Sequence, residues 1–448
     1  MRRDMIPSIM TEKLSRRHLL GGAAAAFTIV KPHLVRGAGK ETLRAGLVGC
    51  GGRGTQATVD MLTGNENVEL VAMADIFEDH LEGALKNLRD PKYVARHAGI
   101  TVERDGKPKE MSAQDLVSSI QPRIKVAPDR HFVGFDAYRK LANSDLDIVM
   151  LATPPGYRPI HFEAAIEAGK HVFTEKPIAT DATGARRFLA AGRKAAEKKL
   201  TVMSGAQRRE DRPYVETVRK IHAGELGEIV ALQANYLSGP VMHAQGRDAK
   251  WGDMEWEHRN WYSFLWLCGD QIVEQHFHNI DFMNWVMGGH PASVVASGGA
   301  AWRPRAALYG NIYDHMSSDF VYPNGVHLTS YCRQFPNGTY RNVSDMVVGT
   351  KGRSTGTDLG EKGISAYVQE HIEMVNSIQG SGPYVNQTVP IAESTLTCIM
   401  ARESAYSGQA ITWEQIMNSK QDLMPRGFGY EMSTKPTPLP VPGEYKFV

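Results

Sequence analysis

Four ionisable side chains lie within eight positions of an otherwise apolar stretch: Glu274, His276, His278 and Asp281. Burying so many ionisable groups is costly unless they serve a function. Histidine, with an unperturbed pKa of about 6.5, is a suitable proton acceptor. A metal site is the competing interpretation, because carboxylate and imidazole both ligate zinc. Strand geometry would align Glu274, His276 and His278 on one ion, whereas in a helix His276 would point away from the other two.

A glycine-rich turn near the start of the chain has the pattern that holds a pyrophosphate. Residues 49–54 read GCGGRG and match G-x-G-x-x-G, which gives as candidate contacts Gly49, Gly51, Gly52, Arg53 and Gly54. The first glycine permits a tight turn, the second lets backbone approach the phosphates, and the third lets helix and strand pack closely. The expected context is present, since an apolar strand precedes the turn (43–48) and a helix follows it (55–62).

The next expected strand, at 68–74, ends on Asp75, which lies 21 residues after Gly54. A carboxylate at this spacing hydrogen-bonds the adenosine ribose hydroxyls of a dinucleotide. Ile76 and Phe77 follow, with no arginine to receive a 2′-phosphate. The sequence therefore favours NAD over NADP.

The elements that would position these residues alternate between strand and helix. Continuous apolar strands are expected at 147–152, 171–174 and 200–203, with helices around His161 and at 183–198. Such strands are typical of a buried parallel sheet, whose ligands lie beyond the carboxyl ends of the strands. Further candidate cofactor contacts at such ends are Thr153, Pro154, Glu175 and Lys176. We predict an α/β fold with a Rossmann domain at 41–207 and a second domain at 208–448. The polar, lysine-rich insertion between Asp79 and Val126 has no role that the sequence reveals.

Six motifs together resemble the Gfo/Idh/MocA oxidoreductase family, named after glucose–fructose oxidoreductase and inositol dehydrogenase. They are GLVGCGGRG (46–54), ATPP (152–155), AGKHVFTEKP (168–177), GAQRR (205–209), GELGEIV (224–230) and CGDQIVEQHFHNID (268–281). The resemblance covers roughly residues 43–415. It implies a nicotinamide-binding Rossmann domain and an α+β domain with an open, predominantly antiparallel sheet. It also implies a homo-oligomer and substrates that are sugars, cyclitols or their derivatives.

The resemblance also implies roles for single residues. It places the catalytic lysine at Lys176 and a catalytic carboxylate and histidine at Glu274 and His278. Glutamate stands where the family has aspartate, and His276 replaces its usual glycine, whereas Asp281 matches. In the oxidation of a secondary alcohol with NAD⁺, we expect His278 to accept the proton and Lys176 to stabilise the charge on oxygen. Glu274 would orient the imidazole or contact a neighbouring hydroxyl.

Aromatic residues directly precede this cluster. Trp251, Trp256, Trp261 and Trp266 fall within 16 residues, beside Tyr262 and several polar side chains. They form either a sugar-binding wall or ordinary core packing. The candidate substrate contacts are His276, Asp281, Arg208, Trp261, Tyr262, Tyr313 and His315.

The first 39 residues have the layout of an export signal. Basic residues lie among positions 1–17, an apolar stretch follows at 18–30, and SRRHLL (15–20) resembles a twin-arginine signal. We predict a signal at 1–40, cut near residue 39 or retained as a tether, and a periplasmic protein. A proline-rich segment (435–442) predicts an extended C-terminal arm over the surface or a neighbouring subunit.

Composition excludes several classes of protein. Lys plus Arg is 51 against 49 for Asp plus Glu, so the net charge of +2 argues against a nucleic-acid binder. No apolar run reaches the roughly 18 residues of a membrane span. The four cysteines show no zinc-ligand spacing, and we expect them to be buried as small hydrophobic residues.

Export creates a difficulty for a nicotinamide enzyme, because no soluble NAD pool is expected outside the cytoplasm. A tightly bound NAD that is recycled within each turnover would resolve it. We therefore predict an oxidoreductase for a secondary alcohol of a sugar, cyclitol or glycoside. One alternative is a NAD-dependent glycoside hydrolase that oxidises carbon 3 transiently and eliminates the glycosidic group, with His276 paired with His278 or Glu274 as its bases. Another alternative is a carbohydrate-binding protein without catalysis.

Overall fold

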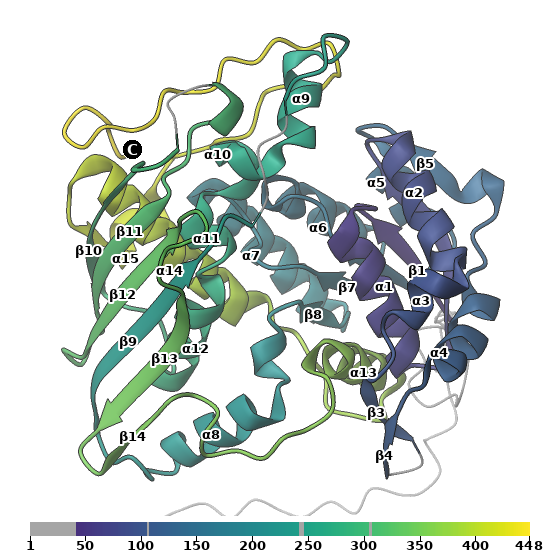
Figure 1. Cartoon of the computed structure of the whole chain (residues 1–448), viewed down its shortest axis with the longest axis horizontal. Helices are drawn as coiled ribbons and strands as arrows, with labels where there is room; N and C mark the ends of the chain where they lie inside the picture. Colours follow the sequence, from purple (N-terminus) through teal and green to yellow (C-terminus); the bar gives the residue numbers. More distant parts are fainter. Residues whose placement is uncertain (1–41, 105–106, 242–245, 304–306) are drawn as a thin grey trace, which may run out of the picture. The chain divides into compact units, whose positions relative to one another are not determined.

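The computed structural model describes residues 42–104, 107–241, 246–303 and 307–448 (Figure 1). The predicted export signal lies outside these residues. The described chain builds a six-stranded sheet, a seven-stranded sheet and a two-stranded hairpin. The predicted combination of a Rossmann domain with an α+β domain is confirmed.

The first sheet is parallel throughout, with the strand order β5-β2-β1-β6-β7-β8. Its strands are β1 (Leu43–Val48), β2 (Val68–Asp75), β5 (His131–Val133), β6 (Ile148–Leu151), β7 (His171–Thr174) and β8 (Val202–Ser204). Its helices include α1 (Gly52–Gly64), α5 (Ala137–Ala142), α6 (Arg158–Glu167) and α7 (Ala182–Glu197). All four residues of β6 are buried, because helices cover both faces of a doubly wound sheet.

The insertion between Asp79 and Val126 packs at the β2 side of this sheet. It contains α2 (Glu78–Arg89), α3 (Pro91–Ala95), the hairpin β3 (Thr101–Arg104) and β4 (Lys107–Glu110), and α4 (Ala113–Ile120). Leu81, Leu88 and Leu116 from the insertion belong to the same buried cluster as Leu47 of β1. The insertion thus extends the core of the Rossmann half.

The second sheet has the order β14-β13-β9-β12-β11-β10-β15, and its one parallel pair among the described strands is β12 with β9. Its strands are β9 (Ile229–Ser238), β10 (Ser293–Gly299), β11 (His315–Val321), β12 (His327–Gln334), β13 (Asn342–Gly349), β14 (Gly352–Ser354) and β15 (Ile411–Thr412). Buried and exposed residues alternate along β11 and β12. One face of this sheet is therefore covered and the other is open.

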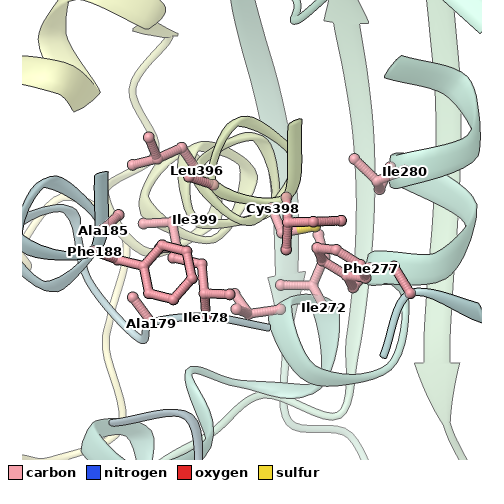
Figure 2. Close-up of a cluster of buried hydrophobic side chains, with 14 of the residues drawn as sticks. Ile178, Ala179, Ala185, Phe188, Ile272, Phe277, Ile280, Leu396, Cys398 and Ile399 are labelled. Atoms are coloured by element: carbon pink, nitrogen blue, oxygen red, sulfur yellow. The ribbon is translucent and has the colours of Figure 1, made fainter. Parts of the chain in front are cut away.

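Helices lie on the covered face and between the two sheets. They are α8 (Arg212–His222), α9 (Asp253–Arg259), α10 (Leu265–Cys268), α11 (Gln271–Glu274), α12 (Phe277–Met287), α14 (Thr388–Ser407) and α15 (Trp413–Asn418). Figure 2 shows α14 packed between α7 and α12, with Phe188 on one side of Ile399 and Phe277 near Cys398. This packing fixes the Rossmann half against the helices that carry Glu274 and His278.

The chain returns to the first sheet near its end. Helix α13 (Ala366–Gln379) packs on α1 and β8, and its Val368 and Met374 join the core of the Rossmann half. A helix that follows β14 of the second sheet in sequence thus packs on the Rossmann half.

The last thirty residues contain no described helix or strand and run over the surface. The Tyr313 hydroxyl donates to the Pro440 carbonyl, and the Tyr445 hydroxyl donates to Glu403. All four cysteines are buried with free thiols, as expected. Among the described helices, none combines the length and apolar character needed to cross a membrane.

Candidate active site

A cavity of about 720 Å³ lies at the carboxyl ends of the parallel strands. One wall is formed by the turn after β1, Asp75 at the end of β2, Thr153 and Pro154 after β6, and Glu175 and Lys176 after β7. The opposite wall comes from the second half of the chain, through Tyr236, Trp261, Tyr262, Glu274, Gln275 and His278. The cavity has the size of a small-molecule site and lies where a doubly wound sheet binds its ligand.

The glycines of the turn have two different structural roles. Gly49 has φ +95°, and a Cβ there would lie 2.7 Å from the Ala152 carbonyl carbon. A Cβ on Gly54 would overlap the Gly49 carbonyl oxygen, so both positions need glycine for the fold. A Cβ on Gly51 or Gly52 would meet no atom within 4 Å, and both residues line the cavity. These two glycines leave an open cradle at the start of α1, which fits a pyrophosphate.

Asp75 is held rigidly at the same end of the cavity. Its carboxylate accepts hydrogen bonds from the backbone N–H groups of Cys50 (2.6 Å) and Phe77 (2.9 Å). Burial raises the pKa of Asp75, whereas these two donors lower it. The fixed carboxylate beside an open cradle fits the ribose of a dinucleotide.

Arg53 and Glu175 form an ion pair on the wall between the turn and Lys176. Arg53 Nε donates to Glu175 Oε1 at 2.5 Å, and its guanidinium lies 4.9 Å from the ring centre of Tyr367 on α13. A Cβ on Gly205 would come within 2.5 Å of the Glu175 carboxylate, so a side chain there would displace this carboxylate. Arg53 and Glu175 both line the cavity, and the Arg53 guanidinium is also in ion-pair contact with Asp60 and Glu370.

Lys176 and Glu274 meet across the cavity from different halves of the chain. Lys176 Nζ donates to the Glu274 carbonyl at 2.6 Å and lies 3.4 Å from Glu274 Oε1. The Tyr262 hydroxyl also interacts with the Glu274 carboxylate. Burial is the largest cause that raises the pKa of Tyr262, and the negative charge of Glu274 raises it further. Among the described contacts, no hydrogen bond joins Glu274 to His278. Glu274 therefore contacts the lysine. The sequence prediction was that it orients the imidazole or contacts a neighbouring hydroxyl.

The segment that carries Glu274 and His278 is not one continuous helix. Helix α11 ends at Glu274 and α12 begins at Phe277. His276 lies at this break, is fully buried outside the cavity lining, and pairs through Nε2 with Ser330 Oγ at 2.7 Å. His276 therefore does not contact a ligand in the cavity, which corrects the sequence prediction. Within the described part of the chain, no group of three or more potential ligands is arranged to hold a metal ion.

Three other predicted substrate contacts also lie away from the cavity lining. Asp281 accepts hydrogen bonds from Arg209 and from Ser394 Oγ, so its carboxylate joins three elements of the core. Tyr313 is buried, with its N–H donated to Asp270 and its hydroxyl to Pro440. His315 lies with Ser317 and Tyr331 in a shallow groove on the open face of the second sheet.

The remaining predicted substrate contacts do line the cavity: Arg208, Trp261 and Tyr262. Arg208 Nη1 donates to Asp345 Oδ2 at 2.8 Å. The tryptophan-rich stretch was predicted to form either a sugar-binding wall or ordinary core packing. Trp261 borders the cavity, whereas Trp256 packs edge-on against Phe264 in a buried cluster.

Several cavity residues were missed by sequence reasoning. They are Phe135, Tyr157, Arg158, His161, Tyr236, His258, Gln275 and Tyr367. Tyr157 and Arg158 follow the Pro154-Pro155 pair after β6, so the strand-end rule alone would have found them. His258, Tyr236 and Tyr367 come from the second half of the chain and carry no such signal.

Comparison with known families identifies both halves of the chain. The profile described as "Oxidoreductase family, NAD-binding Rossmann fold" matches residues 43–205, and the profile described as "GFO/IDH/MocA C-terminal domain" matches residues 214–355. The chain belongs to the Gfo/Idh/MocA family. The resemblance carried by the six sequence motifs is thereby confirmed, as is NAD as the cofactor of the Rossmann half.

Relatives within the Gfo/Idh/MocA family are distant. The "Uncharacterized oxidoreductase YrbE" of Bacillus subtilis is 26% identical over 241 residues, which are 53% of this chain and 64% of the relative. The "scyllo-inositol 2-dehydrogenase (NAD(+))" of the same organism is 25% identical over 177 residues, which are 40% and 46% of the two chains. The matched stretches thus span less than two thirds of these curated relatives.

Solved Gfo/Idh/MocA structures share the fold over most of their length. A scyllo-inositol dehydrogenase from Lactobacillus casei "with bound cofactor NAD(H) and scyllo-inositol" is 17% identical with a TM-score of 0.60, covering 83% of this chain and 99% of that one. An oxidoreductase from Thermotoga maritima is also 17% identical, with a TM-score of 0.61 and coverages of 84% and 100%. At such identities the likeness extends to the fold alone.

The pKa of His278 lies well below its ordinary value of 6.5. Burial is the largest cause, followed by the positive charges of Lys176 and Arg208. The imidazole is therefore neutral at pH 7 and able to accept a proton. As the pH falls, His278 becomes protonated, and so unable to accept a proton, only when the pH passes through its lowered pKa.

We expect the acid limb of the kcat/KM profile to lie below pH 6.5, the ordinary histidine value. Arg208→Gln should move this limb to higher pH, because it removes one of the positive charges that lower the pKa of His278. The exposed Arg212→Gln serves as the control and should leave the limb in place. The measurement is kcat/KM against pH for the three proteins. An acid limb above pH 6.5 in the unaltered enzyme would contradict His278 as the base.

Proposed function

We propose that this protein is a NAD-dependent oxidoreductase for a secondary alcohol of a sugar, cyclitol or glycoside, and that NAD stays bound between turnovers. The observation that carries the proposal is one cavity that holds both the dinucleotide cradle and the group of Lys176, Glu274 and His278. A carbohydrate-binding protein would have no physical reason to keep these charges buried together.

Each of several cavity residues would have a separate role in the oxidation of an alcohol. Bound NAD⁺ supplies the acceptor for the hydride. Neutral His278 accepts the hydroxyl proton, and the Lys176 ammonium stabilises the negative charge that develops on the oxygen. Glu274 holds the Lys176 side chain in position through its carbonyl and carboxylate oxygens. Trp261 and Tyr262 offer apolar ring faces to the C–H surface of the substrate.

Tight retention of NAD is supported by a strap over the Asp75 end of the cavity. The strap consists of α9 and residues 428–434 (Figure 1). A backbone hydrogen bond from Met254 N to Met432 O joins these two segments. His258 of α9 lines the cavity and pairs with the Tyr157 hydroxyl at 2.6 Å. These residues come from the second half of the chain and reach the Rossmann half next to the ribose carboxylate.

Further contacts fasten the strap to residues 76–79, which follow β2 and include the start of α2. Arg259 forms an ion pair with Asp79 at 3.0 Å and lies 3.9 Å from the ring centre of Phe77. The Tyr430 hydroxyl donates to the Ile76 carbonyl, and its ring lies 4.9 Å from that of Phe135. Because Phe77 and Phe135 line the cavity, these contacts must loosen before that end can open.

We expect the double variant Arg259→Ala/Tyr430→Ala to release NAD roughly tenfold faster, which corresponds to a loss of about 1.4 kcal/mol. The dissociation rate can be followed by exchange of bound NAD against a fluorescent analogue. Arg187→Ala, which removes an exposed ion pair with Glu163, is the matched control and should exchange at the original rate. Unchanged exchange in the double variant would show that the strap does not retain NAD.

The proposed function is tested on protein purified without added cofactor. The protein is denatured, and any released nucleotide is identified by mass and absorbance. Stoichiometric NAD(H), together with a change in nicotinamide absorbance on adding a free sugar, cyclitol or glycoside, supports the proposal. Cleavage of a glycoside with no net change in NAD would instead indicate the redox-neutral hydrolase. Absence of nucleotide affinity would indicate a binding protein.

We also propose that the enzyme is exported to the periplasm by the twin-arginine segment at 15–20. The support is the sequence pattern, and an exported enzyme would gain most from a retained cofactor. Fractionation of cells that express the protein and the Arg16→Lys/Arg17→Lys variant tests the proposal. The unaltered protein should reach the periplasm and the variant should remain in the cytoplasm.

A further inference from the structure

Arg158 is a buried cation of the cavity wall that lacks a carboxylate partner. It is 4% exposed and lines the same cavity as Lys176. Its Nη1 donates to the Pro177 carbonyl oxygen, and its Nε is buried without an acceptor. Within the described part of the chain, no Asp or Glu forms an ion pair with it, and its Nη2 has no hydrogen bond.

The other cations of the cavity differ from Arg158 in this respect. Arg53 is paired with Glu175, Lys176 with Glu274, and Arg208 with Asp345. A buried guanidinium without a carboxylate is costly, and burial lowers the pKa of Arg158 to about 10. The group still carries its charge at pH 7, so the wall holds a guanidinium with no carboxylate in ion-pair contact.

Arg158 lies at the end of the cavity that contains Lys176. Its Nη1 holds the carbonyl of Pro177, the residue directly after Lys176. The acidic groups that act on its pKa are Glu175 and Glu274, which flank Lys176. The open phosphate cradle, in contrast, is formed by Gly51 and Gly52 at the start of α1. An anion bound by Arg158 would therefore lie beside the substrate oxygen and not on the pyrophosphate.

We propose that the substrate carries a carboxylate, as a uronic acid or an aldonic acid does, and that Arg158 binds this group. The inference rests on the proposed function, since it names the substrate class of the same site. With Nη1 occupied, the Nε–Nη2 edge of the guanidinium is the free one. This edge presents two parallel N–H donors, which match the two oxygens of a carboxylate. A neutral sugar would leave the charge unpaired.

The test compares acidic and neutral sugars of the same configuration on the NAD-loaded protein. Glucuronate with glucose, and galacturonate with galactose, are titrated calorimetrically and also assayed for turnover. We expect at least one acid to bind roughly 10- to 100-fold more tightly than its neutral counterpart, the range of a charge-assisted hydrogen bond in a buried site. This comparison needs no variant, so it stands even if Arg158 cannot be replaced.

Variants then assign the preference to Arg158. Arg158→Gln should reduce the preference for the acid to about onefold without changing the NAD content, and Arg158→Lys should restore part of it. The exposed Arg187→Gln should keep the full preference. Equal binding of acids and neutral sugars by the unaltered protein overturns the inference. Loss of NAD in Arg158→Gln, with the acid preference kept, also overturns it, because the cation would then serve the cofactor.

The two proposals fail in different ways. A protein that oxidises neutral sugars with bound NAD, and shows no preference for acids, retains the proposed function but not the carboxylate site. A protein that binds uronate in an Arg158-dependent manner but holds no NAD retains the carboxylate site but not the proposed function.

Discussion

Lys176→Met is expected to lower turnover by about 10²- to 10³-fold, the scale of a lost electrostatic contact to a developing oxyanion. Nζ is the donor best placed for this role, since it lies in the cavity beside Glu274 and emerges from the turn directly after β7. The NAD content should stay stoichiometric, because the phosphate cradle and Asp75 are untouched. The rate at which bound NAD⁺ is reduced after mixing with substrate is the direct measurement.

The Lys176→Met result needs controls for folding and for charge. Methionine leaves the Glu274 carboxylate without its cation, so thermal unfolding of the variant must be measured alongside the kinetics. Lys176→Arg keeps the charge but changes the position of the donors, and we expect it to fold and to remain slow. The exposed Lys250→Met should behave as the unaltered enzyme. Turnover of Lys176→Met within threefold of the unaltered enzyme would contradict the proposed role of Lys176 in the reaction.

The Rossmann half was the part of the fold that the sequence predicted most closely. The strands expected at 43–48 and 171–174 match β1 and β7, and the helix expected at 183–198 differs from α7 by one residue at each end. Continuous apolar runs between glycine- and proline-rich turns carry this information locally. The strand-end rule then placed Gly51, Asp75, Thr153 and Lys176 on one cavity, because it depends on topology and not on side-chain packing.

The second half carries less local information about its site. His276 and His278 are two residues apart, yet the break between α11 and α12 sends one to Ser330 and leaves the other at the cavity. Nothing in the sequence marks this break, because no proline or glycine lies at it. For His315 a signal existed: Met316, Ser318 and Phe320 alternate with it along β11 and are buried. Strand parity therefore places His315 on the open face of the sheet.

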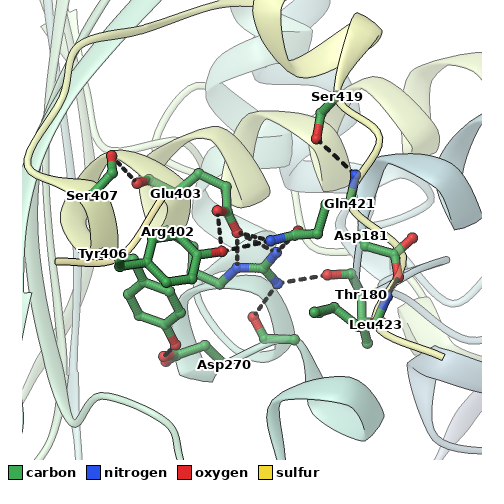
Figure 3. Close-up of polar contacts among 12 residues, drawn as sticks. Thr180, Asp181, Asp270, Arg402, Glu403, Tyr406, Ser407, Ser419, Gln421 and Leu423 are labelled. Atoms are coloured by element: carbon green, nitrogen blue, oxygen red, sulfur yellow. Dashed lines mark hydrogen bonds and ion pairs between the residues drawn. The ribbon is translucent and has the colours of Figure 1, made fainter. Parts of the chain in front are cut away.

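Arg402→Leu is expected to cost about 3–5 kcal/mol of stability, the usual effect of breaking a buried ion pair by removing one partner. Figure 3 shows the Arg402 guanidinium at the centre of a buried polar network. It donates through Nη1 to the carbonyls of Thr180 (2.6 Å) and Gly269 (3.0 Å), and through Nη2 to Glu403 (2.7 Å) and Gln421 (2.9 Å). Leucine would leave all four acceptors without this donor in a site with no access to water.

The contacts of Arg402 make its loss more than a local defect. Thr180 lies four residues after Lys176, and Gly269 five residues before Glu274, so one side chain connects the two segments that carry Lys176 and Glu274. Gln421 in addition ties in the start of the C-terminal arm, whose Tyr445 also contacts Glu403. We therefore expect Arg402→Leu to lower the unfolding midpoint and to expose the arm to limited proteolysis. Arg187→Ala, at an exposed ion pair, should change stability by less than about 1 kcal/mol. If the unfolding midpoint of Arg402→Leu equals that of the control, apolar packing around α14 alone holds the two halves of the chain together.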